Sequence, residues 1–298
     1  MREASQARGR HNPRWRALAE ALLDLLQYRG WLAQLSWRCG WHGKLSVTRY
    51  RVELPAQFNT TPGFKLAFLS DFHAGPTTAA QVFAAAFAHL QQEPVDLLLL
   101  GGDFVSGAAP RIHALLPHLQ ACEPRLGKFA VWGNHDLWTD SAYLQTQLAA
   151  AGVTVLYNQA VFLPAPFAQI SLYGMDDPWT GRPLAPALST TDDIFRLILM
   201  HAPDGLHFLA PGSFELAFAG HTHGGQLARA NGKAWYLPGG ELSRRYPYGD
   251  YLQPDSPWQQ AGRLIVSRGL GCSNLPLRWN ADPELVLCEF VPAADSDC

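Results

Sequence analysis

The stretch FELAFAGHTHGGQ, residues 214–226, runs from a short apolar segment into two histidines that stand one residue apart between glycines. Its first part, 214–219, is typical of a buried strand because nearly every side chain is hydrophobic. Glycine accepts positive φ and has no Cβ, so it suits a tight loop around a bound ion. The stretch therefore predicts a strand that ends by presenting His221 and His223 to one site.

Four other short apolar segments end in the same way, because each is followed at once by residues that bind metal ions. They are 64–70 before Asp71 and His73, 95–100 before Asp103, 128–132 before Asn134, His135 and Asp136, and 196–200 before His201. In an open α/β sheet, ligand groups gather outside the carboxyl ends of the strands. We therefore expect all five strand ends to meet at one location.

The segments between and after these strands indicate the fold class. Helices are predicted over 76–94 and 139–152, and further strands over 263–267 and 284–290. The second helix has Asp140 or Ser141 as its N-cap and Gly152 as its end. Strands that alternate with helices predict an α/β protein whose layers enclose buried sheets.

The composition excludes several classes of protein. Of 298 residues, 48% are hydrophobic and 16% charged, as in globular domains, and the net charge of -2 gives no indication of a nucleic-acid partner. The five cysteines include no C-x-x-C pair, which favours neither a zinc knuckle nor a disulfide framework and indicates a reducing cytoplasm. No stretch approaches the ~20 apolar residues that a membrane-spanning helix needs.

The beginning of the chain is basic, with ten Lys and Arg against three Asp and Glu in residues 1–52. Within it, 17–29 places leucines at helical spacing, which predicts an amphipathic helix. Such a helix either lies on a membrane surface or packs on its own domain or a second subunit. We expect a leader over 1–45, a catalytic domain over 46–293 and a tail over 294–298. If the helix lies on a membrane surface, we expect a cytoplasmic protein that is attached peripherally to the inner face of the membrane.

The residue types at the five strand ends indicate a dinuclear metal centre. Imidazole nitrogen and carboxylate oxygen, without thiolate, suit Mn, Fe or Zn. One carboxylate can bridge two ions, and two ions about 3.5–4 Å apart activate water and hold the attacking and leaving oxygens of a phosphate ester. The other histidines lack this context, and we expect structural roles for His11, His42, His89, His113, His118 and His207.

Together these motifs resemble those of the calcineurin-like metallophosphoesterases, which read D-x-H, G-D-x-x-[DN], G-N-H-[DE], a lone H and G-H-x-H. The resemblance spans 64–291, and HAPD (201–204), GHTHGGQ (220–226) and VSRGLG (266–271) are similar to its bacterial YaeI/YkuE-like subgroup. The resemblance implies an αββα sandwich of two mixed β-sheets flanked by helices.

The resemblance also implies two metal sites that share Asp103. The first is formed by Asp71, His73, Asp103 and His223, and the second by Asp103, Asn134, His201 and His221. By the same resemblance, His135 contacts the phosphate and assists the leaving oxygen, and Asp136 orients its ring. Ser106 departs from the family pattern, which commonly has Asp or Asn there, so we expect it to affect fine tuning and not metal binding.

The segment 232–258 is rich in aromatic residues. It is predicted either to form the rim of the cleft or to be an ordinary loop whose aromatic side chains pack inward. In the first case Arg244 and Arg245 neutralise phosphate oxygens and Tyr246 contacts the substrate.

The sequence thus predicts a dinuclear phosphoesterase that hydrolyses a phosphodiester or pyrophosphate bond by attack of metal-bound hydroxide, with Mn favoured over Fe or Zn. The basic leader favours a lipid-linked substrate such as UDP-diacylglucosamine or a phospholipid. Alternative substrates are a cyclic nucleotide, another phosphodiester or monoester, and a phosphoprotein. A non-catalytic scaffold of the same fold and a mononuclear site both conflict with the complete set of ligands.

Overall fold

The computed structural model describes residues 30–58, 62–186, 193–210, 212–252 and 262–292. The predicted helix at 17–29 and the predicted tail lie outside these residues. The division into leader, catalytic domain and tail therefore stays a prediction.

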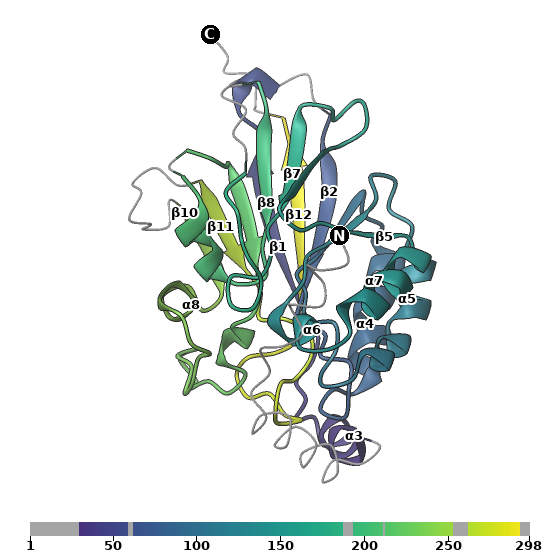
Figure 1. Ribbon diagram of the computed structural model, residues 1–298. Helices are drawn as coiled ribbons and strands as arrows, with labels where there is room; N and C mark the ends of the chain where they lie inside the picture. Colours follow the sequence, from purple (N-terminus) through teal and green to yellow (C-terminus); the bar gives the residue numbers. More distant parts are fainter. Residues whose placement is uncertain (1–29, 59–61, 187–192, 211, 253–261, 293–298) are drawn as a thin grey trace.

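Two six-stranded β-sheets form the centre of the molecule (Figure 1). The first has the order β1 (Ser46–Glu53), β12 (Glu284–Val291), β2 (Phe64–Leu69), β3 (Leu97–Leu100), β4 (Lys128–Ala130) and β5 (Val153–Val155). The second has the order β10 (Gly249–Leu252), β11 (Arg263–Val266), β9 (Leu216–Ala219), β8 (Phe195–Leu199), β7 (Ile170–Gly174) and β6 (Gln159–Phe162). The β12–β2, β10–β11 and β6–β7 pairs are antiparallel and the others parallel, which confirms two mixed sheets.

The side chains of β2 show how the two sheets share one core. Leu66 and Phe68 face the second sheet, and the ring centroid of Phe68 lies 5.3 Å from that of Phe218 on β9. Ala67 and Leu69 point the other way, into the layer between the first sheet and its helices. Because successive side chains of a strand alternate between faces, a strand covered on both sides is apolar throughout. This explains the unbroken apolar segments of the sequence.

Helices cover the outer face of the first sheet, whereas shorter helical turns cover that of the second (Figure 1). The first layer contains α4 (Ala80–Gln92), η4 (Ala109–Ala114), α5 (Leu116–Ala121) and α7 (Ser141–Ala150). The second contains η5 (Pro203–Phe208) and α8 (Glu241–Arg245). The other described elements are α3 (Trp31–Arg38), η3 (Ala56–Phe58), α6 (Asn134–Leu137) and η6 (His223–Gly225). The expected sandwich is confirmed, with the thinner helical layer on the second sheet.

Candidate metal centre

Backbone hydrogen bonds hold the strand-end loops against one another. The Asp71 N–H donates to the Gly102 carbonyl and the His73 N–H to the Asp103 carbonyl, both at 2.9 Å, so the loops after β2 and β3 run side by side. In the second sheet, the Gly220 N–H donates to the His201 carbonyl at 2.8 Å, which joins the loops after β8 and β9. Backbone bonds therefore join neighbouring strand ends within each sheet, and the His221 N–H links the two sheets by donating to the Asp71 carboxylate at 3.0 Å.

Five of the predicted ligands have a left-handed backbone conformation. The φ angles are 53° at Asp71, 44° at His73, 54° at Asp103, 71° at His221 and 54° at His223. Such values are uncommon for residues other than glycine and cluster at functional sites, where the surrounding structure holds the strain. Only three other described non-glycine residues have a positive φ, namely Asn158, Gln226 and Asn280. The concentration of strain marks these loops as the site.

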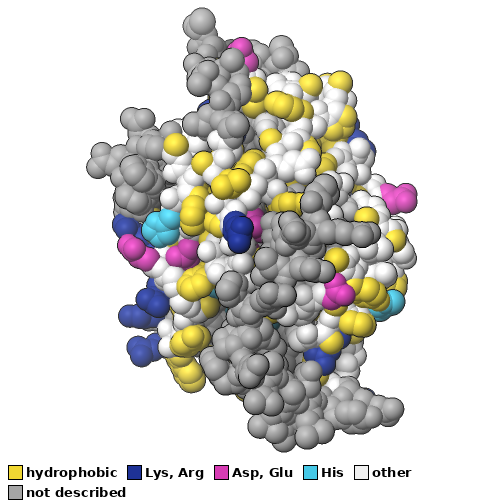
Figure 2. All heavy atoms as spheres, viewed as in Figure 1, with side chains coloured by type: hydrophobic (Ala, Val, Ile, Leu, Met, Phe, Trp, Pro, Cys, Tyr) yellow, Lys and Arg dark blue, Asp and Glu magenta, His cyan; other side chains and the backbone are white. Residues whose placement is uncertain are grey.

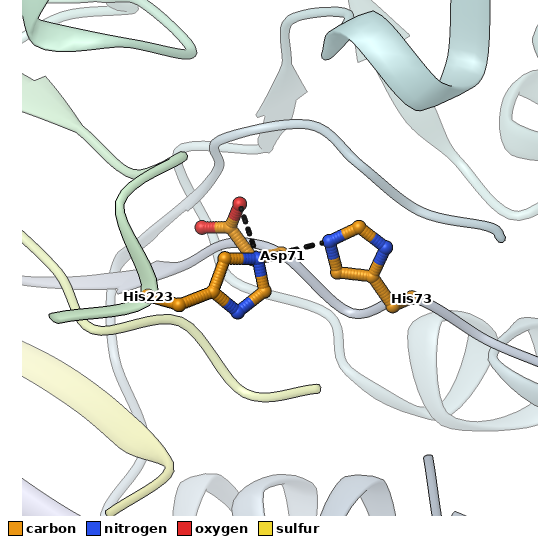
Figure 3. Close-up of side chains that lie close together, drawn as sticks. All are labelled: Asp71, His73 and His223. Carbon is orange, nitrogen blue, oxygen red and sulfur yellow. Dashed lines mark hydrogen bonds and ion pairs between the residues drawn. The ribbon is translucent and has the colours of Figure 1, made fainter. Parts of the chain in front are cut away.

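The first ligand cluster contains Asp71, His73 and His223 (Figure 3). The Nε2 atoms of His73 and His223 lie 3.0 Å apart, and His223 Nε2 lies 3.6 Å from Asp71 Oδ1. All three side chains are buried, and His73 and His223 lie at the edge of the cleft described below. The three side chains come from both sheets, since β2 precedes the first two and β9 precedes the third.

The second ligand cluster contains Asp103, His201 and His221, with Asn134 beside it. His201 Nε2 lies 3.2 Å from both His221 Nδ1 and Asn134 Oδ1. His201 Nδ1 lies 2.7 Å from the carbonyl oxygen of Gly101, which accepts a hydrogen bond from it. This bond directs Nδ1 at the backbone and leaves Nε2 to face the cluster.

Asp103 connects the two clusters. Its Oδ2 atom lies 3.4 Å from Nε2 of His73 in the first cluster and 3.4 Å from Nε2 of His201 in the second. Its Oδ1 atom accepts a hydrogen bond from the His135 backbone N–H at 2.8 Å. The side chain that the sequence predicts as the shared ligand therefore stands between the two groups.

The charges of the site fit divalent cations. Burial raises the pKa of Asp71 to about 6, although His201 opposes the rise. Burial disfavours the charged form of Asp103 too, yet His201 and His135 hold its pKa well below the ordinary value. Burial, reinforced by His201, lowers the pKa of His221 to about 3. Buried carboxylates beside a neutral imidazole form a donor set that fits divalent ions.

Further side chains orient the ligands. Ser70 Oγ donates to Asp71 Oδ2 at 2.6 Å, and Arg278 Nη2 lies 3.2 Å from Nδ1 of His223. Ser106 Oγ is hydrogen-bonded to His73 Nδ1 at 2.9 Å. The residue that departs from the family pattern thus contacts a predicted ligand directly. Its hydroxyl group fixes the ring from the side opposite the cluster.

His135 lies at the centre, but Asp136 does not orient its ring as expected. A ring nitrogen of His135 lies within 4.8 Å of ligand atoms of His73 and Asp103. The His135 ring packs edge-on against that of Trp138, with ring centroids 4.7 Å apart. The Asp136 carboxylate instead accepts the backbone N–H groups of Phe104 at 2.8 Å and Gly133 at 3.0 Å. Asp136 is fully buried within α6, and its bond to the Phe104 N–H holds the loop that contains Asp103 against this helix.

A cleft of about 660 Å³ opens beside the two clusters. Its lining includes His73, Asp103, Asn134, His135, His221 and His223, together with Trp138, Trp179, Trp235, Tyr236 and Leu275. Trp179 stacks on His221 with ring centroids 5.6 Å apart. Its loop follows β7 and is held by Asp177, whose carboxylate accepts the Trp179 N–H at 3.1 Å. The sequence carries a signal for this loop, because Asp176 and Asp177 follow a strand as the ligands do.

None of the three predicted substrate contacts belongs to the described lining of this cleft, although Arg244 lines an adjoining hollow that shares Trp235 and Tyr236 with it. Tyr246 is only 5% exposed and packs in the core outside the second sheet, because α8 buries one side against that sheet. Arg245 lies over the Tyr246 ring, 5.8 Å from its centroid, and Arg244 lines a separate hollow with Trp235 and Tyr236. The rim prediction for 232–258 holds for Trp235 and Tyr236, and the inward-packing alternative holds for Tyr246.

Comparisons with known proteins agree with this geometry. The family model of the calcineurin-like phosphoesterases matches residues 64–225. The chain is 34% identical over 241 residues to phosphodiesterase YaeI of Escherichia coli, covering 78% of this chain and 84% of that protein. It is 29% identical over 232 residues to the uncharacterized metallophosphoesterase YkuE of Bacillus subtilis, covering 76% and 78%. The chain belongs to the calcineurin-like phosphoesterase family, and is a hydrolase that acts on phosphoester bonds.

Among solved structures, the chain is similar to a dimetal phosphatase from Danio rerio, with 12% sequence identity and a TM-score of 0.44. That match covers 72% of this chain and 90% of the other.

Proposed function

We propose that the protein hydrolyses a phosphodiester or pyrophosphate bond in a substrate that carries a lipid group. The cleft supports this proposal, because its wall beside the ligand clusters is aromatic and apolar. Trp235 and Tyr236 are 67% and 76% exposed, and Leu275 is 48% exposed. A small phosphate monoester leaves such a wall without a partner, whereas a diester with an acyl or aromatic substituent covers it.

In this proposal the two clusters hold two divalent ions, with Mn favoured and Fe or Zn as alternatives. When bound, such ions lower the pKa of water and neutralise charge on phosphate oxygens. Asp71, His73 and His223 hold the first ion, His201, His221 and Asn134 the second, and Asp103 faces both. Asp136 keeps the Asp103 loop in register through the Phe104 N–H.

His135 is proposed to contact the phosphate and to deliver a proton to the leaving oxygen. Its ring lines the cleft and stands beside both His73 and Trp138, so it is accessible from the side on which a substrate enters. Its backbone N–H, donated to Asp103 Oδ1, ties the position of the ring to that of the carboxylate.

A cyclic nucleotide or another soluble phosphodiester is the second candidate. The ring of Trp179 supports it, because a tryptophan face stacks with a nucleobase as well as it contacts an acyl chain. A nucleotide-linked lipid such as UDP-diacylglucosamine contains both groups and unites the two candidates. A phospholipid uses only the apolar part of the wall.

The test begins with protein stripped of metal and refilled with Mn. We expect hydrolysis of bis(p-nitrophenyl) phosphate to depend on Mn and to exceed that of p-nitrophenyl phosphate. Trp179→Ala is expected to raise KM for the diester about tenfold and to leave the monoester nearly unchanged. The matched control is Trp279→Ala, an exposed tryptophan outside the cleft lining. Equal turnover of both esters, with no effect of Trp179→Ala, would overturn the proposed preference.

A further inference from the structure

Five large apolar side chains are exposed on one connected part of the surface, which we call the rim face. They are Trp41, Trp235, Tyr236, Leu275 and Trp279, with exposed fractions between 48% and 76%. Single exposed apolar residues are ordinary, but a contiguous group of this size marks an interaction site.

The backbone places these side chains next to one another. The Trp41 carbonyl accepts the Arg278 N–H at 2.8 Å, and the Trp279 carbonyl accepts the Ala228 N–H at 2.8 Å. The segment that contains Ala228 is also bonded to that of Trp235, because the Trp235 N–H donates to the Leu227 carbonyl at 2.9 Å. Segments that are far apart in the sequence are thus hydrogen-bonded side by side, and each of them carries an exposed tryptophan or lies next to one.

Helix α3 extends the rim face toward the beginning of the chain. The Trp41 N–H donates to the Ser36 carbonyl of α3 at 2.8 Å. Trp31 and Leu35, one turn apart on this helix, are 54% and 44% exposed. Figure 1 shows α3 at the lower end of the molecule, beside the yellow loops that precede β12. The sequence before α3, residues 1–29, contains six arginines and three acidic residues.

The charge around the rim face is positive although the whole chain has a net charge of -2. Across 30–45, 226–236 and 273–282, the exposed charged residues are Arg38, Lys44, Arg229, Lys233 and a single acid, Asp282. Figure 2 shows dark blue basic side chains beside yellow apolar ones at the lower left, where Figure 1 places the green segment after β9. Lysine is depleted at the centres of protein–protein interfaces, whereas tryptophan mixed with basic residues is typical of surfaces that meet lipid headgroups.

We propose that the rim face docks on an anionic lipid bilayer. The tryptophans enter the headgroup layer while the lysines and arginines remain level with the anionic groups. Among the described residues, no helix could cross a bilayer.

Docking brings the catalytic cleft to the membrane. Trp235, Tyr236 and Leu275 belong to the rim face and also line the cleft. A phosphate in the headgroup layer therefore enters the cleft without its lipid leaving the bilayer. This consequence rests on the proposed function, whereas the docking itself needs no catalysis.

The experiment measures co-sedimentation of the full chain with vesicles of phosphatidylcholine alone or mixed with phosphatidylglycerol. We expect binding to the mixed vesicles that weakens at high salt. The Trp41→Ser/Trp279→Ser double variant is expected to lose binding about tenfold or more. Neither residue lines the cleft, so hydrolysis of a soluble ester checks that this variant is folded. The matched control, Phe162→Ser, removes a 59% exposed aromatic residue at the far end of the second sheet and is expected to bind normally.

Three outcomes would overturn the proposal. The first is no binding by the wild-type chain to the mixed vesicles. The second is equal binding by the wild type and the double variant, which would assign the contact to residues 1–29 alone. The third is a dimer in solution that the double variant dissociates, which would make the rim face a subunit interface. Loss of vesicle binding with intact hydrolysis separates this proposal from the proposed function.

Discussion

The two sheets contribute different chemistry to the candidate metal centre. The loops of the first sheet supply Asp71, His73, Asp103 and Asn134, and those of the second supply His201, His221 and His223. All the negative charge therefore comes from one sheet, and the other offers only imidazole nitrogen. The sheets meet through the core that contains Phe68 and Phe218. Neither sheet can bind an ion fully by itself, so the complete centre exists only when the two are packed together.

The strongest test of this division is Asp103→Asn, which removes the one carboxylate that faces both clusters. We expect loss of bis(p-nitrophenyl) phosphate hydrolysis by about 10³-fold or more and weaker retention of both ions, because the variant takes negative charge from each half. Activity and metal content are measured on the same sample. Asp193→Asn, an exposed carboxylate ahead of β8, is the matched control. Retention of both ions with full activity would show that Asp103 does not connect the clusters.

A smaller effect is expected when only one cluster loses an imidazole. His223→Asn is predicted to weaken the first cluster and His201→Asn the second, each lowering activity about 10²-fold and metal content by about one ion per chain. His207→Asn, on the exposed part of η5, is the control.

Metal analysis with a spectroscopically active ion such as Co(II) then distinguishes the clusters. The two variants must leave different spectra, because the remaining ion has different neighbours in each. Identical spectra would contradict the partition into two clusters.

The sequence predicts the ligand clusters well because their signal is local. Each ligand follows a short apolar strand, and the ends of such strands meet in an open α/β sheet whatever the details of packing. The start of α7 is local as well: Asp140, one of two predicted caps, accepts the Tyr143 N–H at 3.0 Å. The short strands β5 and β6 lack that signal because they are three and four residues long and partly exposed.

Contacts between distant segments could not be predicted. Asp136 was expected to orient the neighbouring His135 ring, but its partners at Phe104 and Gly133 become visible only when the loop after β3 is folded against α6. Tyr246 stands among exposed aromatic residues in the sequence, yet the five-residue α8 turns it into the core. Local patterns identify the residue types, and the tertiary fold decides which of them face the cleft.

Ser106→Ala tests how much the hydrogen bond to one predicted ligand, His73, contributes to metal affinity. Removing the hydroxyl group frees Nδ1 of His73 from its 2.9 Å contact, and we expect metal affinity to fall about tenfold. Affinity is measured by titration of the stripped protein with Mn. Ser106→Asn restores a side chain that hydrogen-bonds the ring and is expected to recover most of the affinity. Equal affinities in all three proteins would mean that the serine does not position His73.

The smallest effect on catalysis is expected at His42, a buried histidine that belongs to neither cluster. It is fully buried, lies 3.6 Å from the sulfur of Cys272 and accepts the Ala79 N–H at 3.4 Å. Burial, followed by the nearby charge of Arg278, lowers its pKa from 6.5 to about 4. The unfolded chain therefore binds a proton at a higher pH than the folded chain does.

The free energy of unfolding should consequently fall as the pH drops from about 6.5 to about 4, because protons then favour the unfolded state. At neutral pH the titration of His42 should not affect it. The full loss amounts to about 3 kcal/mol. His42→Gln keeps an acceptor for the Ala79 N–H but cannot take up a proton. Urea unfolding of both proteins at neutral and acidic pH isolates the difference. If both lose the same free energy of unfolding on acidification, His42 does not titrate in this range. If only the wild type loses the extra stability, this part of the pH dependence belongs to the buried His42 imidazole.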